Sequence, residues 1–306
     1  MPTPSRSTLI NRTLRVLKKH FKPVPANKDR SLFEHLVFAC LLENSPHETA
    51  EQVFRSLRDD YFDWNEVRVS TIRELSEVTK PLVDSNEAAE RLKQTLHSVF
   101  EAVYQFDLEA LKKQNIGQAT KQLEKLNGST PFVVAYVTQM ALGGHSIPIN
   151  RGLLVAMEVA GVISDGEAKA GNVPGLERAV SKSKGLECGS LLHQLGVEVG
   201  RNPYGQAARK LLLEIAPDCK SRLPKRATAT AAPPEAAEAK DKAGTAKPDK
   251  RKAATKAGPA GTPAAEKDGK RADKKKPTTK RPTKAGTKTP TKKKTTTRKL
   301  TKRKPR

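Results

Sequence analysis

The chain has 306 residues, with 57 Lys/Arg, 33 Asp/Glu and a formal net charge of +24. No apolar run approaches the roughly 18 residues of a membrane-spanning helix, so the composition argues against an integral membrane protein. The excess charge is confined to one end: residues 221–306 hold 29 basic and 7 acidic side chains, whereas residues 1–220 hold 28 and 26. We therefore expect a nearly neutral globular unit with a polycationic extension, and such extensions bind polyanions.

Cysteine and histidine usage points away from a disulfide framework or a metal site. Cys40, Cys188 and Cys219 are far apart and form no CxxC pair, and the six histidines include no pair with ligand spacing. The amino-terminal segment lacks the continuous apolar core of a signal peptide and suits an amphipathic helix better. We expect a cytoplasmic protein that holds no metal.

After the amphipathic segment, the next hundred residues predict a succession of helices. Residues 29–31 are a helix start and lead into residues 32–42, which are apolar nearly all round and belong in a core. Residues 43–47 break that helix, and helical spacing then resumes. Residues 70–75 have the Ser/Thr-x-x-Glu start of a short helix, and Asp84-Ser85-Asn86 is expected to cap a longer one.

Residues 118–160 predict two helices joined by a tight hairpin at residues 127–130, with a short link into a third helix. Helices punctuated by Gly and Pro continue to residue 215, and no segment shows the two-residue alternation of a strand. We predict an all-α fold of about ten helices over residues 1–220. Its two packed lobes are expected to be residues 29–150, which include the hairpin, and residues 1–28 with 151–220.

Residues 221–306 are rich in Lys, Ala, Pro and Thr, and large apolar side chains almost vanish there. Nothing in this segment can offset the entropy of ordering the backbone, so we predict a disordered basic tail. Lysine runs neutralise phosphates with little sequence preference, which favours DNA, with RNA as an alternative polyanion and a mere solubility tail as the other interpretation. The tail residues expected to contact DNA include Lys274, Lys275, Lys276, Lys292, Lys293 and Lys294.

The hairpin has the features of a phosphate-binding turn. Gly128 allows a tight or left-handed turn, and Thr130 can cap the helix that Pro131 begins. The amides of Ser129 and Thr130 are then expected to point outward beside the positive end of a helix, where a phosphate oxygen binds. An ordinary corner between two helices is the alternative interpretation.

The run LEKLNGSTPFVVAYV (residues 123–137), followed by IPINRGLL (residues 147–154), resembles the helix-hairpin-helix DNA glycosylases of the endonuclease III superfamily. Residues 32–57 are similar to the buried early helix of that family and the loop after it, and the resemblance covers roughly residues 29–219. It implies a helical fold whose hairpin grips the backbone of duplex DNA, in a setting of base-excision repair or nucleoid binding.

The sequence departs from this family where the chemistry is expected. The family's Gly-x-Gly hairpin reads Gly128-Ser129-Thr130, which leaves less room for close approach of a phosphate. The lysine that attacks the sugar in lyase-type members is replaced by Phe132, which is no nucleophile. The family aspartate falls on Asn150, which has the shape but not the charge and is expected to survive as a helix cap.

Two further family features are altered. The resemblance places the four cysteines of an iron–sulfur cluster near Tyr204, Leu211, Glu214 and Cys219, so only one thiol remains and we expect no such cofactor. The residue that family members insert into DNA aligns with Asn44, which could fill a gap in the duplex or simply hold a loop.

The sequence thus favours a DNA-binding protein of the endonuclease III type that has lost the usual catalytic residues. An active glycosylase is the first alternative, and it needs a relocated acid such as Glu158. A polyanion-binding interaction scaffold is the second alternative. A carboxylate or lysine facing a pocket beside Asn150 would favour the enzyme, whereas a filled apolar pocket lined by Phe132 would favour the DNA-binding protein.

Overall fold

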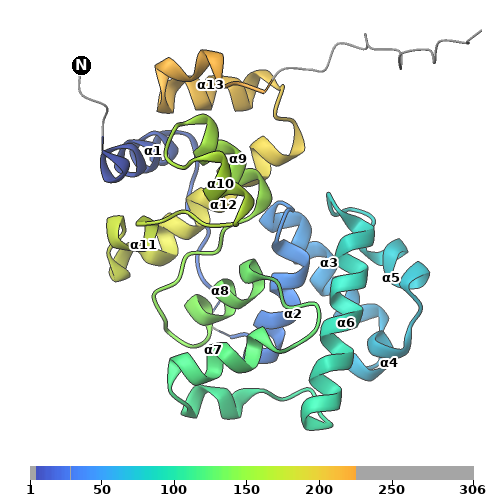
Figure 1. Ribbon diagram of the computed structural model, residues 1–306. Helices are drawn as coiled ribbons and strands as arrows, with labels where there is room; N and C mark the ends of the chain where they lie inside the picture. Colours follow the sequence, from blue (N-terminus) through green and yellow to red (C-terminus); the bar gives the residue numbers. More distant parts are fainter. Residues whose placement is uncertain (1–4, 28, 225–306) are drawn as a thin grey trace, which may run out of the picture. The chain divides into compact units, whose positions relative to one another are not determined.

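The computed structural model describes residues 5–27 and 29–224, and within these residues the secondary structure is entirely helical (Figure 1). The expected all-α class is confirmed, with more and shorter helices than the ten predicted. The α-helices are α1 (Arg6–His20), α2 (Leu32–Leu42), α3 (His47–Asp60), α4 (Trp64–Val69), α5 (Ile72–Thr79), α6 (Ser85–Val103), α7 (Ile116–Glu124), α8 (Pro131–Met140), α9 (Arg151–Val159), α10 (Asp165–Lys169), α11 (Leu176–Ala179), α12 (Gly185–Arg201) and α13 (Gln206–Ile215). Short 3-10 turns cover Glu109–Lys113, Lys182–Lys184 and Pro217–Ser221.

Local side chains fix the beginnings of several helices. Ser31, Thr71 and Ser164 each form a capping box, in which the hydroxyl accepts from a backbone amide and a glutamate three residues later closes the pair. The expected cap at the start of α6 is wrong in one respect. Asp84 occupies the N-cap position, but its side chain makes no capping bond. Its Oδ2 instead accepts from the side-chain Nδ2 of Asn44 at 3.0 Å.

Two separate clusters of buried apolar side chains organise the described residues. The first lies between residues 32 and 137 and surrounds α2, of which ten of eleven residues are buried. The second joins α1 to residues 147–223 around α12. Two clusters mean two lobes, which we call the hairpin lobe (residues 29–146) and the terminal lobe (residues 5–27 and 147–224).

The terminal lobe depends on a very close crossing of α9 and α12. A Cβ atom added at Gly152 would lie 1.9 Å from the carbonyl oxygen of Gly196 and 2.7 Å from the amide nitrogen of Gly200. Only glycine permits backbones to approach this closely. The crossing fixes the start of α9, and therefore Asn150, against the middle of α12.

The basic residues after position 224, including the six lysines of the predicted tail contacts, lie outside the described residues. Among the helices that are described, none is both long and apolar enough to cross a membrane.

Candidate nucleic-acid interface

The hairpin between α7 and α8 is built as a tight turn against α6. Gly128 has a φ of +82°, and a Cβ there would lie 2.6 Å from the carbonyl oxygen of Arg91 and 2.7 Å from Thr95 Oγ1. Glycine is therefore required at position 128 for two reasons: the backbone is left-handed, and α6 leaves no space for a side chain. On the other side of the turn, the Asn127 amide donates to Ser98 Oγ at 3.1 Å. The hairpin is thus held in place by its own lobe.

The amides of the turn are only partly free. Ser129 N–H donates to the Leu126 carbonyl at 3.0 Å, so the expectation that this amide points outward to a phosphate is wrong. The turn closes on itself and consumes that donor. The amides of Gly128 and Thr130 have no hydrogen-bond partner among residues 5–27 and 29–224. Phosphate capture by the hairpin therefore depends on these two amides.

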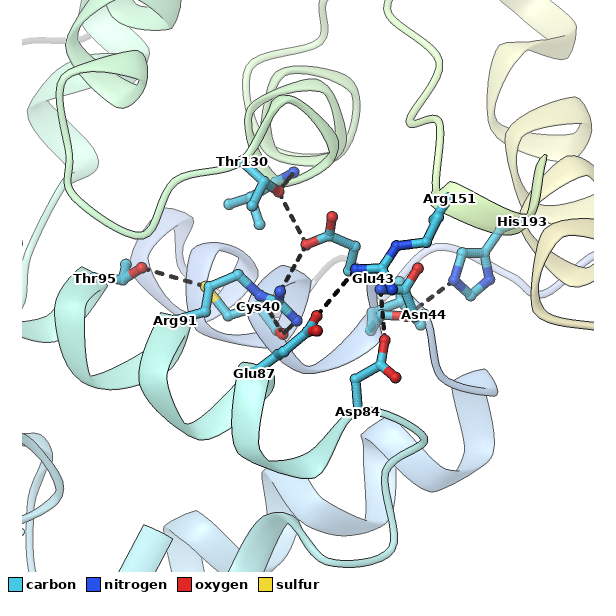
Figure 2. Close-up of polar contacts among 12 residues, drawn as sticks. Cys40, Glu43, Asn44, Asp84, Glu87, Arg91, Thr95, Thr130, Arg151 and His193 are labelled. Carbon is cyan, nitrogen blue, oxygen red and sulfur yellow. Dashed lines mark hydrogen bonds and ion pairs between the residues drawn. The ribbon is translucent and has the colours of Figure 1, made fainter. Parts of the chain in front are cut away.

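Thr130 caps α8 as expected, and it also ties the hairpin to the rest of the lobe. Its hydroxyl accepts from the Val133 amide and donates to Glu43 Oε2 at 3.0 Å. Glu43 in turn pairs with Arg91 Nη1 at 3.2 Å, while the same guanidinium donates twice to the Cys40 carbonyl (Figure 2). This brace joins the end of α2, α6 and the start of α8, and the Arg91 and Glu43 side chains are 10% and 15% exposed. Sequence reasoning missed it, because nothing in the spacing relates positions 43, 91 and 130.

Asn44 lies in the turn after α2 and directly follows Glu43 of this brace. Its amide donates to Asp84 Oδ2 at 3.0 Å, and Figure 2 shows the pair beside the ion pair of Arg151 with Glu87 (3.2 Å). The side chain is partly buried and engaged with a carboxylate. Insertion of Asn44 into a duplex would require this bond to break, so its role as a DNA-contacting residue stays a prediction.

Asn150 is the N-cap of α9 and is sealed from solvent. Its Oδ1 accepts from the Leu153 amide at 2.9 Å, and the residue is 1% exposed. A Cβ at Gly196 would lie 1.9 Å from this oxygen, so the backbone of α12 lies directly over the side chain. The expected capping bond is present. An uncharged side chain buried in this way has neither a proton to exchange nor access to a sugar.

Phe132 is 2% exposed and lines a small cavity between the two lobes. The cavity measures about 50 Å³, a third of the roughly 150 Å³ that an apolar cavity needs to hold one benzene. Its fifteen lining residues include no Asp, Glu or Lys. A flipped base is larger than benzene, so a pocket for one would have to be wider than this cavity. Besides apolar side chains, the lining includes the polar residues His47, Gln139, Ser190, His193 and Gln194.

The titratable groups around the cavity are held neutral. The Nε2–H of His193 donates to the Leu42 carbonyl at 3.0 Å, which links α12 to the end of α2, and burial lowers the His193 pKa to about 4. Burial also lowers the pKa of His47 and raises the pKa of the Tyr136 hydroxyl. None of these groups therefore supplies a charge to the cavity at neutral pH.

The relocated acid that an enzyme would need does not lie beside Asn150. Glu158 is eight residues further along α9, and at 1.5 Å per residue the two positions are about 12 Å apart along the helix axis. Lys121 and Lys125, the two lysines that precede the hairpin, are exposed on α7 and in the turn that follows it. They are suited to contact a phosphate and not to attack a buried sugar.

The positions that the resemblance assigns to iron–sulfur ligands do not fit a cluster. Leu211 is buried in the terminal core, and Glu214 is engaged by Lys19 and by His20, whose Nε2 lies 2.6 Å from the carboxylate. Cys219 supplies the one thiol, which is buried and lies 3.5 Å from the Leu212 carbonyl. In the part of the chain that the structure describes, no group of three or more His, Cys, Asp or Glu side chains could hold a metal ion.

No protein-family model and no curated protein matches the sequence. Solved structures do match. A non-covalent endonuclease III–DNA complex has a TM-score of 0.53 at 16% identity over 72% of this chain and 99% of that chain. A trapped endonuclease III–DNA covalent intermediate has a TM-score of 0.52 at 16% identity over 73% and 100%. The described part of this chain therefore has the fold of endonuclease III.

Proposed function

We propose that this protein binds duplex DNA without the glycosylase or lyase chemistry associated with its fold. The binding part of the proposal is supported by the fold shared with endonuclease III, which the two matched structures hold in complex with DNA. It is also supported by a braced hairpin that leaves the amides of Gly128 and Thr130 available beside the start of α8. DNA repair or nucleoid binding in the cytoplasm is the proposed setting.

One observation supports the non-catalytic part of the proposal. The two positions that correspond to the family's catalytic residues hold buried, uncharged side chains. Phe132 and Asn150 are 2% and 1% exposed, and the cavity beside Phe132 has neither a carboxylate nor an amine in its lining. Catalysis at a sugar needs a nucleophile or an anionic group in contact with the reacting atoms. The buried residues offer neither, so the fold is retained here for binding.

The hairpin's share of DNA affinity can be measured with two substitutions at Thr130. Thr130→Val and Thr130→Pro both remove the hydroxyl that caps α8 and contacts Glu43, but only proline also removes the backbone amide. The φ of −79° at Thr130 lies close to the proline value, so proline fits the turn. We expect Thr130→Pro to bind a duplex about tenfold more weakly than Thr130→Val, measured by fluorescence anisotropy at low salt.

The valine variant is the matched control, because it loses the capping hydroxyl but keeps the backbone amide. We expect it to lose about 1 kcal/mol of folding stability, which shows how much of any change in affinity comes from the lost cap. Circular dichroism of both variants establishes that they remain folded. Equal affinities of the two variants for DNA would remove the Thr130 amide from the interface.

Activity on damaged DNA tests the non-catalytic proposal. The full-length protein is incubated with duplexes that contain an abasic site or a damaged base, and strand cleavage is measured after alkaline and neutral work-up. We expect cleavage at the level of the protein-free control, because the residues that line the cavity include neither the lysine nor the carboxylate of the usual chemistry. Cleavage above that level, abolished by Phe132→Ala or Asn150→Ala, would establish an enzyme with an unfamiliar mechanism.

A further inference from the structure

The two lobes carry opposite net charge. Residues 29–146 hold 12 Lys/Arg and 18 Asp/Glu, a net of −6, whereas residues 5–27 and 147–224 together hold 16 and 8, a net of +8. A polyanion is repelled by the first distribution and attracted by the second. The hairpin therefore lies in the lobe that is electrostatically less suited to DNA, and most of the body's attraction must come from the terminal lobe.

A groove on the terminal lobe gathers part of this positive charge. α1 packs against α11 and α12 (Figure 1). An open groove of about 550 Å³ is lined by residues of α1, α12, the end of α11 and the segment between α11 and α12. None of its lining residues is acidic, and three are cationic. The groove is lined by Asn11, Leu14, Arg15, Lys18, Ala179, Val180, Ser181, Lys184 and Cys188.

Two of the three cations in the groove are available to a ligand. Lys18 pairs with Glu187 at 2.8 Å, but Arg15 and Lys184 are exposed and make no ion pair with any described residue. They come from different elements, α1 and the 3-10 turn before α12, so they present charge from two sides. A guanidinium can bind a phosphate with two parallel hydrogen bonds, and an ammonium adds a point charge.

The start of α12 lies beside the same cations. This helix has 17 residues, begins at Gly185 directly after Lys184, and has no side chain capping its first turn. Its first turn contains Glu187, which pairs with Lys18, and the Gly185 amide donates to the Lys182 carbonyl, so the helix start itself adds little positive charge. Ser181, which also lines the groove, contributes a hydroxyl that can donate to a phosphate oxygen.

We propose that this groove is a second DNA contact, in which Arg15, Lys184 and the hydroxyl of Ser181 bind the phosphate backbone of a duplex. The inference rests on the proposed DNA-binding function and assigns part of it to a surface outside the hairpin lobe. Contacts of this type position the protein on DNA without reading its sequence. They also supply the attraction that the acidic hairpin lobe lacks.

Lysine footprinting of the full-length protein tests the groove directly. Brief acetylation of amines, with and without a random-sequence duplex, is read by mass spectrometry at individual lysines. We expect Lys184 to be protected severalfold at low salt, and the protection to disappear as salt rises. Lys80, exposed at the end of α5 in the hairpin lobe, is the control and is expected to react equally in both samples.

The footprint separates the two proposals. Protection of Lys125 beside the hairpin without protection of Lys184 would overturn the groove and leave the proposed function intact. Protection confined to lysines beyond residue 224 would overturn the groove and remove the hairpin from the interface, leaving DNA binding to that segment alone. Protection of Lys184 by duplex RNA but not by DNA would assign the groove to another partner and so refute this inference.

A charge reversal in the full-length protein gives an independent measurement. The double variant Arg15→Glu, Lys184→Glu is expected to lower the log–log salt slope of duplex binding by about 1.8, because each lost phosphate contact removes about 0.9. Both side chains are exposed and unpaired within the described residues, so the thermal midpoint should not change. Arg73→Glu with Lys80→Glu makes the same charge change on α5 and its C-cap. A slope equal to that of this control would rule the groove out.

Discussion

Gly152→Ala is expected to destabilise the protein by about 3 kcal/mol or more. The added methyl group would lie 1.9 Å from the Gly196 carbonyl oxygen and 2.7 Å from the Gly200 amide nitrogen, both backbone atoms that no rotamer change can move. Overpacking of a core typically costs about 1–3 kcal/mol, and here α9 and α12 must separate along the centre of the terminal lobe. Urea unfolding followed by circular dichroism measures the loss as a lower midpoint.

Gly166→Ala is the matched control, because it is also a Gly→Ala change within a helix. A Cβ at Gly166 meets no atom within 4 Å, and the residue is exposed on α10. Reduced freedom of the unfolded chain should stabilise this variant by about 0.5 kcal/mol. If Gly152→Ala unfolded at the same urea concentration as Gly166→Ala, the close crossing of α9 and α12 would be wrong.

This crossing also explains why Asn150 could be interpreted correctly from sequence while its environment could not. The cap follows from residue type and its position before a helix, which are local features. The burial of Asn150 depends on Gly196, 46 positions further on. Because Gly196 has no side chain, the Asn150 side chain fits against the backbone of α12. A glycine in the middle of a helix does not reveal which side chain it accommodates.

The same division applies to the hairpin. The left-handed conformation of Gly128 and the start of α8 at Thr130–Pro131 depend on local residue types, so the sequence predicts both, and both are present. The donor set was predicted less well, because the Ser129 amide is consumed by the turn itself. The brace of Glu43 and Arg91 joins segments that are distant in sequence, and single-sequence patterns contain no information on such pairing.

The misplaced cap at Asp84 has a similar cause. Asp is a good N-cap residue, and the sequence Asp84-Ser85-Asn86 fits the local rule. The carboxylate nevertheless accepts from Asn44, which arrives from the turn after α2. A tertiary partner replaces the local one, and only the packing of α2 against α6 decides between them.

Removal of residues 225–306 is expected to weaken binding to a duplex at least about a hundredfold near 0.1 M salt. The deleted segment holds 28 Lys/Arg and 7 Asp/Glu, so the remaining chain falls from +24 to +3. Proteins that neutralise six to ten phosphates lose about 10³–10⁵ in affinity between 50 and 200 mM salt. Among the described residues, the last member of the two buried clusters is Leu223, so the deletion removes none of the members seen in residues 5–27 and 29–224.

The salt dependence of anisotropy titrations separates the tail from the body. We expect the truncated protein to keep a shallow slope from the hairpin and the terminal groove, and the full-length protein to show a much steeper one. Replacing Lys274–Lys276 and Lys292–Lys294 with glutamine in the full chain should lower the slope by up to about 5, since six phosphate contacts at about 0.9 each are lost. The same slope before and after truncation would place all DNA contacts in the body, where Arg15 and Lys184 are the exposed cations of the groove.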